Sequence, residues 1–69
     1  SISIFPNPVK NTLNIEGSVQ LVEIYDVFGK LVLNSNNNII NTEKLSDGIY
    51  VVKVNTKNNI IVTKKIYQI

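Results

Sequence analysis

The 69-residue sequence contains no cysteine, histidine, tryptophan or methionine, and its basic residues include no arginine. The absence of cysteine and histidine excludes disulfides, thiolate zinc sites, imidazole bases and the usual transition-metal ligands. Nucleic-acid binding usually relies on arginine and a dense basic face, and the net charge here is only +2. We therefore expect no nucleic-acid partner. A chain this short forms one domain, whose core has to hold by packing alone.

Long apolar runs are also missing. Crossing a bilayer takes about 20 apolar residues, and the runs here are only a few residues long. No apolar segment of a signal peptide is present either, so we expect no membrane insertion. The chain starts at Ser1 without an initiator methionine, and we expect residues 1–69 to be the end of a larger protein.

Short runs rich in isoleucine and valine make up most of the chain. Pro, Gly, Asn, Asp and Ser separate them at intervals of about 8 to 12 residues, which is typical of an all-β sandwich or barrel. The pattern predicts seven strands, at residues 2–4, 12–16, 20–27, 30–34, 38–42, 49–55 and 60–68. We expect a seven-stranded immunoglobulin-like β-sandwich with antiparallel Greek-key topology and no disulfide.

The segment VQLVEIYDVFGKLV, residues 19–32, also fits the spacing of a helix. We favour strands because the segment is rich in Val, Ile and Tyr and because Gly29 would interrupt a helix. The sequence DVFG then predicts a hairpin turn. Asp26 starts this turn, and Gly29 supplies a positive φ in a G1 bulge.

A second hairpin joins residues 49–55 to residues 60–69 through the turn NTKNN. Alternation places Tyr50, Val52 and Val54 on one face of the first strand, and this uncharged face is the predicted core face. In the last strand each alternate set contains both lysine and apolar residues. Its register therefore stays open between the even-numbered set, 60 to 66, and the odd-numbered set, 61 to 67.

The stretch LSDGIY, residues 45–50, places a turn before a tyrosine at the start of a strand. In immunoglobulin-like sandwiches such a tyrosine follows a tight corner, and its hydroxyl bonds to a backbone group a few residues upstream. Asp47, Gly48 and Tyr50 fit this corner. Val52 stands where those domains have a disulfide cysteine, so an aliphatic core would replace the bridge. The alternatives for Tyr50 are an ordinary buried aromatic and a ligand-stacking residue.

Groups that could catalyse a reaction are few. Paired carboxylates need a cleft, for which a domain of this size has little room, and the sequence has no nucleophile elbow. Asp26 and Asp47 both fall in turns, where carboxylates usually bond to backbone N–H groups. We therefore expect no enzymatic activity and no cofactor.

The alternative function is an accessory carbohydrate- or calcium-binding β-sandwich of a secreted enzyme. Asn and Asp oxygens suit calcium, and Asn is dense in NSNNN, residues 34–38. That stretch contains no acid, however, and tryptophan is absent, so we expect no metal site. A structural spacer or adhesin repeat is a third possibility, although the chain shows no internal repeat.

Four motifs follow one another along the chain: FPNPVKNTLNI at 5–15, VEIYDVFGKLV at 22–32, INTEKLSDGIYVVKV at 40–54 and VTKKIYQI at 62–69. Together they resemble the C-terminal sorting domain of the type IX secretion system over nearly the whole chain. The resemblance implies a seven-stranded immunoglobulin-like sandwich that acts as an export address at the end of a secreted cargo protein. Phe5 stands where the family commonly has another aromatic residue.

The resemblance also implies a route. The cargo would cross the inner membrane by a signal peptide and pass through the periplasm. The outer-membrane translocon and its shuttle protein would recognise the sorting domain. A surface sortase would then remove the domain, and the cargo would be released or joined to the cell surface. The domain would be a substrate of that sortase and not an enzyme.

The family's motifs match this sequence at four sets of positions. Pro6, Asn7 and Pro8 match its PNP motif, and because proline restricts φ to about −65° and disfavours helix at the preceding residue, we expect a stiff extended lead-in. Three further sets follow PNP along the chain. We expect structural roles for the first two of them, and direct recognition at PNP and at the third. In chain order these sets are Gly29 and Lys30, then Leu45, Gly48 and Tyr50, then Lys64, Lys65 and Ile66.

The last strand suggests a mode of recognition. Lysines on an edge strand normally discourage pairing with other strands. A last strand with free backbone groups could nonetheless be bound by β-augmentation, with Lys64 and Lys65 meeting acidic groups of a partner.

Overall fold

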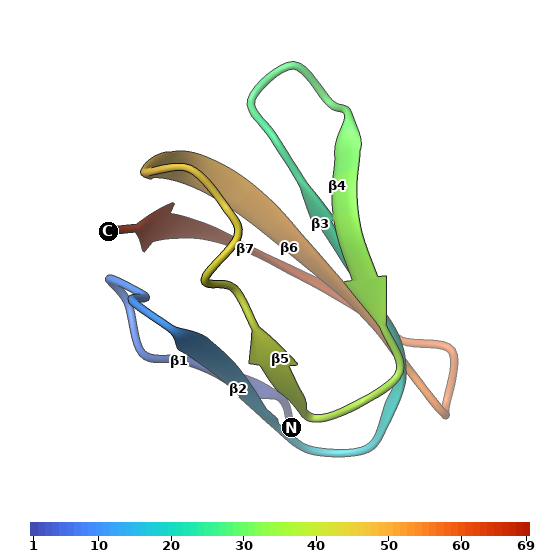
Figure 1. The fold of residues 1–69 in the computed structure, drawn as a ribbon. Helices are drawn as coiled ribbons and strands as arrows, with labels where there is room; N and C mark the ends of the chain where they lie inside the picture. The colour runs from blue at the N-terminus through green and yellow to red at the C-terminus, as the bar shows by residue number, and fades with distance from the viewer.

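Seven strands form two packed sheets in the computed structural model, which describes all residues 1–69 and contains no helix (Figure 1). The three-stranded sheet has the order β1 (Ser3–Phe5), β2 (Thr12–Glu16), β5 (Ile39–Asn41). The four-stranded sheet has the order β4 (Leu31–Ser35), β3 (Val19–Tyr25), β6 (Gly48–Thr56), β7 (Ile61–Gln68). All strand pairs are antiparallel. The predicted immunoglobulin-like sandwich is confirmed, and no strand limit differs from the prediction by more than two residues.

The order of strands shows how the two layers are connected. β1 and β2 pair in one sheet, β3 and β4 in the other, β5 returns to lie beside β2, and β6 and β7 complete the second sheet beside β3. These returns across the layers are Greek-key connections. They bury the inner face of each sheet against the other.

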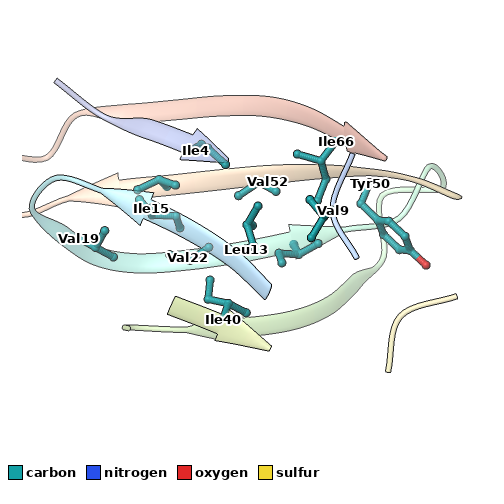
Figure 2. Packing of buried hydrophobic residues seen from close by; sticks show 12 residues of the cluster. Ile4, Val9, Leu13, Ile15, Val19, Val22, Ile40, Tyr50, Val52 and Ile66 are labelled. Carbon is teal, nitrogen blue, oxygen red and sulfur yellow. The ribbon is translucent and has the colours of Figure 1, made fainter. Parts of the chain in front are cut away.

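Apolar side chains from both sheets meet between the layers (Figure 2). The alternation of β6 is as predicted: Tyr50, Val52 and Val54 are buried, whereas Ile49 and Val51 are 37% and 38% exposed. Burying one such aliphatic side chain stabilises the fold by about 1.5 to 3 kcal/mol. The buried cluster consists of Ile4, Val9, Leu13, Ile15, Val19, Val22, Ile24, Ile40, Tyr50, Val52, Val54 and Ile66.

The structure settles the register of β7. Ile66 and Gln68 are buried and Val62 is half-buried, so the even-numbered side chains face the other sheet. Lys64 belongs to this inward set, and because the set contains a charged residue, alternation alone could not identify the buried face of β7. The Lys64 ammonium extends to β1, the edge strand of the other sheet, and donates to the carbonyl oxygen of Ile4 at 2.7 Å.

The DVFG hairpin forms as predicted, and the helical alternative for residues 19–32 is wrong. The backbone N–H of Asp26 donates to Lys30 O at 2.9 Å and that of Gly29 to Asp26 O at 3.1 Å. Gly29 has a φ of +83°, which is the left-handed conformation that a G1 bulge requires. The Asp26 carboxylate accepts from the N–H groups of Phe28 and Lys30 at 2.9 and 3.0 Å.

A second irregularity follows this turn, and the sequence did not indicate it. Ile24 pairs with Leu33 while Tyr25 pairs with Leu31, so Val32 is an extra residue on β4. A bulge of this kind increases the local twist of a strand pair. In Figure 1 the β3–β4 hairpin projects beyond the rest of the sandwich.

Tyr50 forms the predicted corner. Its hydroxyl donates to the carbonyl oxygen of Ser46, four residues upstream, at 2.7 Å. The ring is only 8% exposed, and its oxygen points away from the apolar cluster (Figure 2). The hydroxyl thus holds the loop before β6 against the first residues of that strand.

Removing this hydroxyl tests the corner. Tyr50→Phe is expected to lower the free energy of unfolding by about 0.5 to 1.5 kcal/mol, because one hydrogen bond is lost while the ring stays packed. Chemical denaturation measures the change. Tyr67→Phe is the matched control, since Tyr67 is 46% exposed and its hydroxyl makes no hydrogen bond within the domain. Equal midpoints for the wild type and Tyr50→Phe would contradict the corner's contribution.

Candidate recognition surface

The Pro6–Asn7–Pro8 motif lies between β1 and β2, where the chain leaves the three-stranded sheet for the edge of β7. It is not the extended lead-in that we expected, because the backbone bends at Asn7 and Pro8. The Phe5–Pro6 and Asn7–Pro8 peptide bonds are both cis. Hydrogen bonds from Asn7 to β7 hold the motif in this position. The expectation of an extended lead-in considered only local φ preferences and could not include these long-range bonds.

The Asn7 side chain pairs with the outer edge of β7 much as another strand would. Its Oδ1 accepts from the backbone N–H of Tyr67 at 3.0 Å, and its Nδ2 donates to the carbonyl oxygen of Lys65 at 3.3 Å. An amide side chain carries both a donor and an acceptor, so it can satisfy both kinds of edge group. Asn7 is therefore engaged within the domain.

Val9 continues this coverage of the edge. Its N–H donates to Tyr67 O at 2.7 Å, and its carbonyl accepts from the N–H of Ile69 at 2.8 Å. These two bonds form a parallel bridge between Val9 and Gln68. The outer edge of β7 is thus occupied from Lys65 to Ile69, and a strand adding to β7 by β-augmentation would find free backbone groups only nearer its start.

The three residues of the terminal motif differ in their accessibility. Ile66 is fully buried in the core. Lys64 is bonded through its ammonium to β1. The Lys65 side chain is exposed on the outer face of the four-stranded sheet. Of this motif, only Lys65 presents a charged group that makes no hydrogen bond or ion pair within the domain.

The motif residues from Leu45 to Gly48 lie in the loop before β6 and at the first residue of that strand. Leu45 is half-buried against the core, and its N–H donates to Thr42 O at 3.0 Å. Gly48 starts β6 with a φ of +151°. Asp47 is exposed and makes no side-chain hydrogen bond. The bonding to backbone N–H groups that we expected of both aspartates therefore occurs at Asp26 alone, because only the Asp26 carboxylate faces the N–H groups of its own turn.

Gln68 is a structural residue that the sequence analysis missed. Its Nε2 donates to the carbonyl oxygens of Lys10 at 2.7 Å and Thr42 at 3.0 Å, and the residue is only 3% exposed. The side chain thus ties the end of β7 to the loops that border β2 and β5. Gln68 lies two residues after Ile66 and therefore on the same face of β7. This signal indicates burial only once the buried face of β7 is known.

Charge is sparse on the outer face of the four-stranded sheet. The one ion pair of the structure joins Lys53 Nζ to Glu23 Oε1 at 4.0 Å, across neighbouring strands. Partial burial of the phenol, the negative charge of Glu23 and a hydrogen bond to Glu23 together raise the pKa of Tyr25 above its ordinary value of 10.0. Tyr25 is therefore neutral at physiological pH.

Two surface grooves are present. The larger, about 480 Å³, is lined by Leu33, Asn41, Glu43 and Lys44. The smaller, about 150 Å³, lies where the N-terminus meets the β6–β7 turn. No helix in the structure could cross a membrane.

Comparison with known proteins supplies the family. No curated protein matches the chain. The family model described as "Secretion system C-terminal sorting domain" matches residues 3–68, which include all seven strands and every motif residue discussed above. This match does not favour the accessory carbohydrate- or calcium-binding function. The chain belongs to the secretion system C-terminal sorting domain family, the sorting signals of type IX secretion.

Proposed function

We propose that residues 1–69 are the folded export address at the end of a larger secreted protein. The observation that supports this most strongly is the family match across residues 3–68. A sorting domain of this family implies export to the cell surface or release from the cell. The family is not catalytic, and the domain would act by being recognised.

The finer steps of the route belong to the same proposal. An upstream cargo would carry the domain into the periplasm, where the shuttle protein and the outer-membrane translocon bind it. A surface sortase would then cut the chain ahead of the sandwich. The placement of the N-terminus suits this order, since Ser1 and Ile2 lie at one end of the molecule (Figure 1). A cut before the sandwich would leave its core intact.

The proposal is tested by locating a reporter protein. A periplasm-directed reporter is fused ahead of residues 1–69 and produced in a host with a working type IX translocon and in the same host without it. The reporter is expected outside the cell only in the first host. The reporter without residues 1–69 serves as the control and should stay in the periplasm of both.

A folded fusion that stays in the periplasm of both hosts would overturn the proposed function. Thermal denaturation of the purified fusion establishes whether the domain is folded. A thermal shift with calcium or with glycans would then be the next measurement, because those ligands distinguish the accessory binding module.

A further inference from the structure

Contacts within the domain engage most of the motif residues near the two chain ends. Asn7, Val9 and Lys64 bond to neighbouring strands and Ile66 is fully buried. In contrast, eleven large hydrophobic residues are exposed. Singly scattered apolar residues are normal on a protein surface, whereas a contiguous group of them marks an interaction site.

Several of the exposed residues are neighbours on the outer face of the four-stranded sheet. Cross-strand pairing joins Leu31 to Tyr25, Tyr25 to Val51 and Val51 to Lys65, which makes one row across β4, β3, β6 and β7. Ile49 and Tyr67 pair in the adjoining row. Paired residues point to the same face of a sheet, so these side chains form a continuous surface.

The hairpin tip lies next to this surface. Phe28 lies in the turn just beyond the Leu31–Tyr25 pair, and its ring is 91% exposed. Large aromatic residues are frequent anchors of protein interfaces because they bury much area in a pocket of the partner. We refer to this group as the distal patch: Tyr25, Phe28, Leu31, Ile49, Val51 and Tyr67.

The N-terminus lies at the other end of the molecule. Ser1 and Ile2 lie beside Gly17, so closely that a Cβ on Gly17 would overlap the Ile2 side chain. They also line the groove at the β6–β7 turn. Figure 1 shows the N-terminus and the β3–β4 hairpin at opposite ends. The point at which cargo would join the chain is therefore remote from the hairpin end of the distal patch.

Two lysines flank the distal patch, and neither has an ion-pair partner. Lys65 completes the row that contains Val51, and Lys30 directly precedes Leu31. Glu23, which adjoins Tyr25 on the same face, is paired with Lys53. The Asp26 carboxylate is already bonded to two backbone N–H groups, and Asp47 lies before β6, outside both rows. An apolar surface flanked by free ammonium groups complements an apolar surface with carboxylates at its rim.

We infer that the distal patch is the surface by which the domain binds its sorting receptor, and that the receptor presents an apolar centre rimmed by carboxylates. The inference rests on the proposed function and adds to it the surface that is recognised and the chemistry of the partner. The outer sheet face and hairpin tip make the contact, while the motif residues of the chain ends keep that face in shape.

The test removes apolar contact area with little effect on the fold. The double variant Phe28→Ser/Val51→Thr is compared with Ile60→Ser/Ile39→Thr in the reporter fusion. The controls are an exposed loop residue and an exposed strand residue, 58% and 65% exposed, that lie outside the distal patch. Export is measured as the extracellular fraction of reporter, and folding by thermal denaturation.

Export of the patch variant is expected to fall about tenfold or more, as for the loss of interface anchor residues, while the control variant is exported like the wild type. Equal export of both folded variants would overturn the inference and leave the proposed function standing. A wild-type fusion that is not exported would overturn the proposed function and with it the assignment of a receptor. If the double variant does not fold, Phe28→Ser alone decides, since that ring lies almost wholly in solvent.

Charge reversal tests the chemistry of the partner. Lys65→Glu should reduce export, whereas Lys57→Glu, in the β6–β7 turn at the other end, should not. An unchanged export of Lys65→Glu would overturn the carboxylate rim. The mass of the purified wild-type domain in solution tests the remaining occupant: a dimer that Phe28→Ser dissociates would show that the distal patch binds a second copy of the chain instead.

Discussion

Deletion of Lys64–Ile69 is expected to abolish both the cooperative unfolding transition and export of the reporter, while the upstream cargo stays folded. The deletion removes five of the eight register pairs that join β7 to β6, removes the buried Ile66 and Gln68, and uncovers Tyr50 and Val52. A domain of this length has a free energy of unfolding of roughly 3 to 10 kcal/mol, which the lost burial and hydrogen bonds together exceed.

Circular dichroism during heating and the extracellular reporter fraction are the two measurements. Removal of Ile69 alone is the control, because that residue is 58% exposed and contributes one N–H bond to Val9. The shortened domain should then remain folded, with a loss of about 1 kcal/mol. A chain of residues 1–63 that melts cooperatively, or that still exports its cargo, would contradict the prediction.

Among substitutions that keep the size of the side chain, Gln68→Glu is expected to lower the free energy of unfolding the most. It places a carboxylate at 2.7 and 3.0 Å from the carbonyl oxygens of Lys10 and Thr42, where the amide nitrogen now donates. The other side-chain oxygen of Gln68 is already buried without a partner. A buried charge without a compensating group costs about 3 to 5 kcal/mol, so much of the domain should be unfolded at pH 7.

The same variant should regain stability in acid. Burial and the facing carbonyl oxygens favour the protonated carboxyl, so the pKa of the new glutamate is higher in the folded state than its unfolded value of about 4.3. The folded state therefore binds the proton more tightly, and the stability is present below about pH 4.3 and is lost as the pH rises through the folded pKa. Denaturation at several pH values measures this, with the exposed Gln20→Glu as control. A Gln68→Glu domain as stable as the Gln20→Glu domain at pH 7 would refute it.

These two predictions change how the terminal motif is interpreted. A loss of export after deletion of the last strand does not by itself identify a recognised sequence, because Ile66 and Gln68 hold the sandwich together. Direct recognition at Pro6–Pro8 and at the terminal motif stays a prediction. Distal-patch variants separate the two explanations, since Phe28 and Val51 lie outside the buried cluster.

The sequence by itself determined the fold class, the number and approximate limits of the strands, the G1 hairpin at Gly29 and the corner at Tyr50. Each of these depends on local information, namely alternation, turn residues and the φ that glycine permits. Its four ordered motifs also led to the sorting-domain family, which the match over residues 3–68 confirms.

Only the tertiary structure decided which face of β7 is buried, what Asn7 and Gln68 do, and which apolar residues meet at the distal patch. Asn7 bonds to backbone groups that are 58 and 60 residues away in the sequence. Gln68 bonds to backbone groups that are 26 and 58 residues away. The residues of the distal patch come from four strands and a turn, and no local pattern specifies the pairing of β3 with β6 that joins the two hairpins. Lys64 shows the reason most clearly: it lies in the inward-facing set of β7, and it is tolerated there because its ammonium donates a hydrogen bond to a carbonyl oxygen of the opposite sheet.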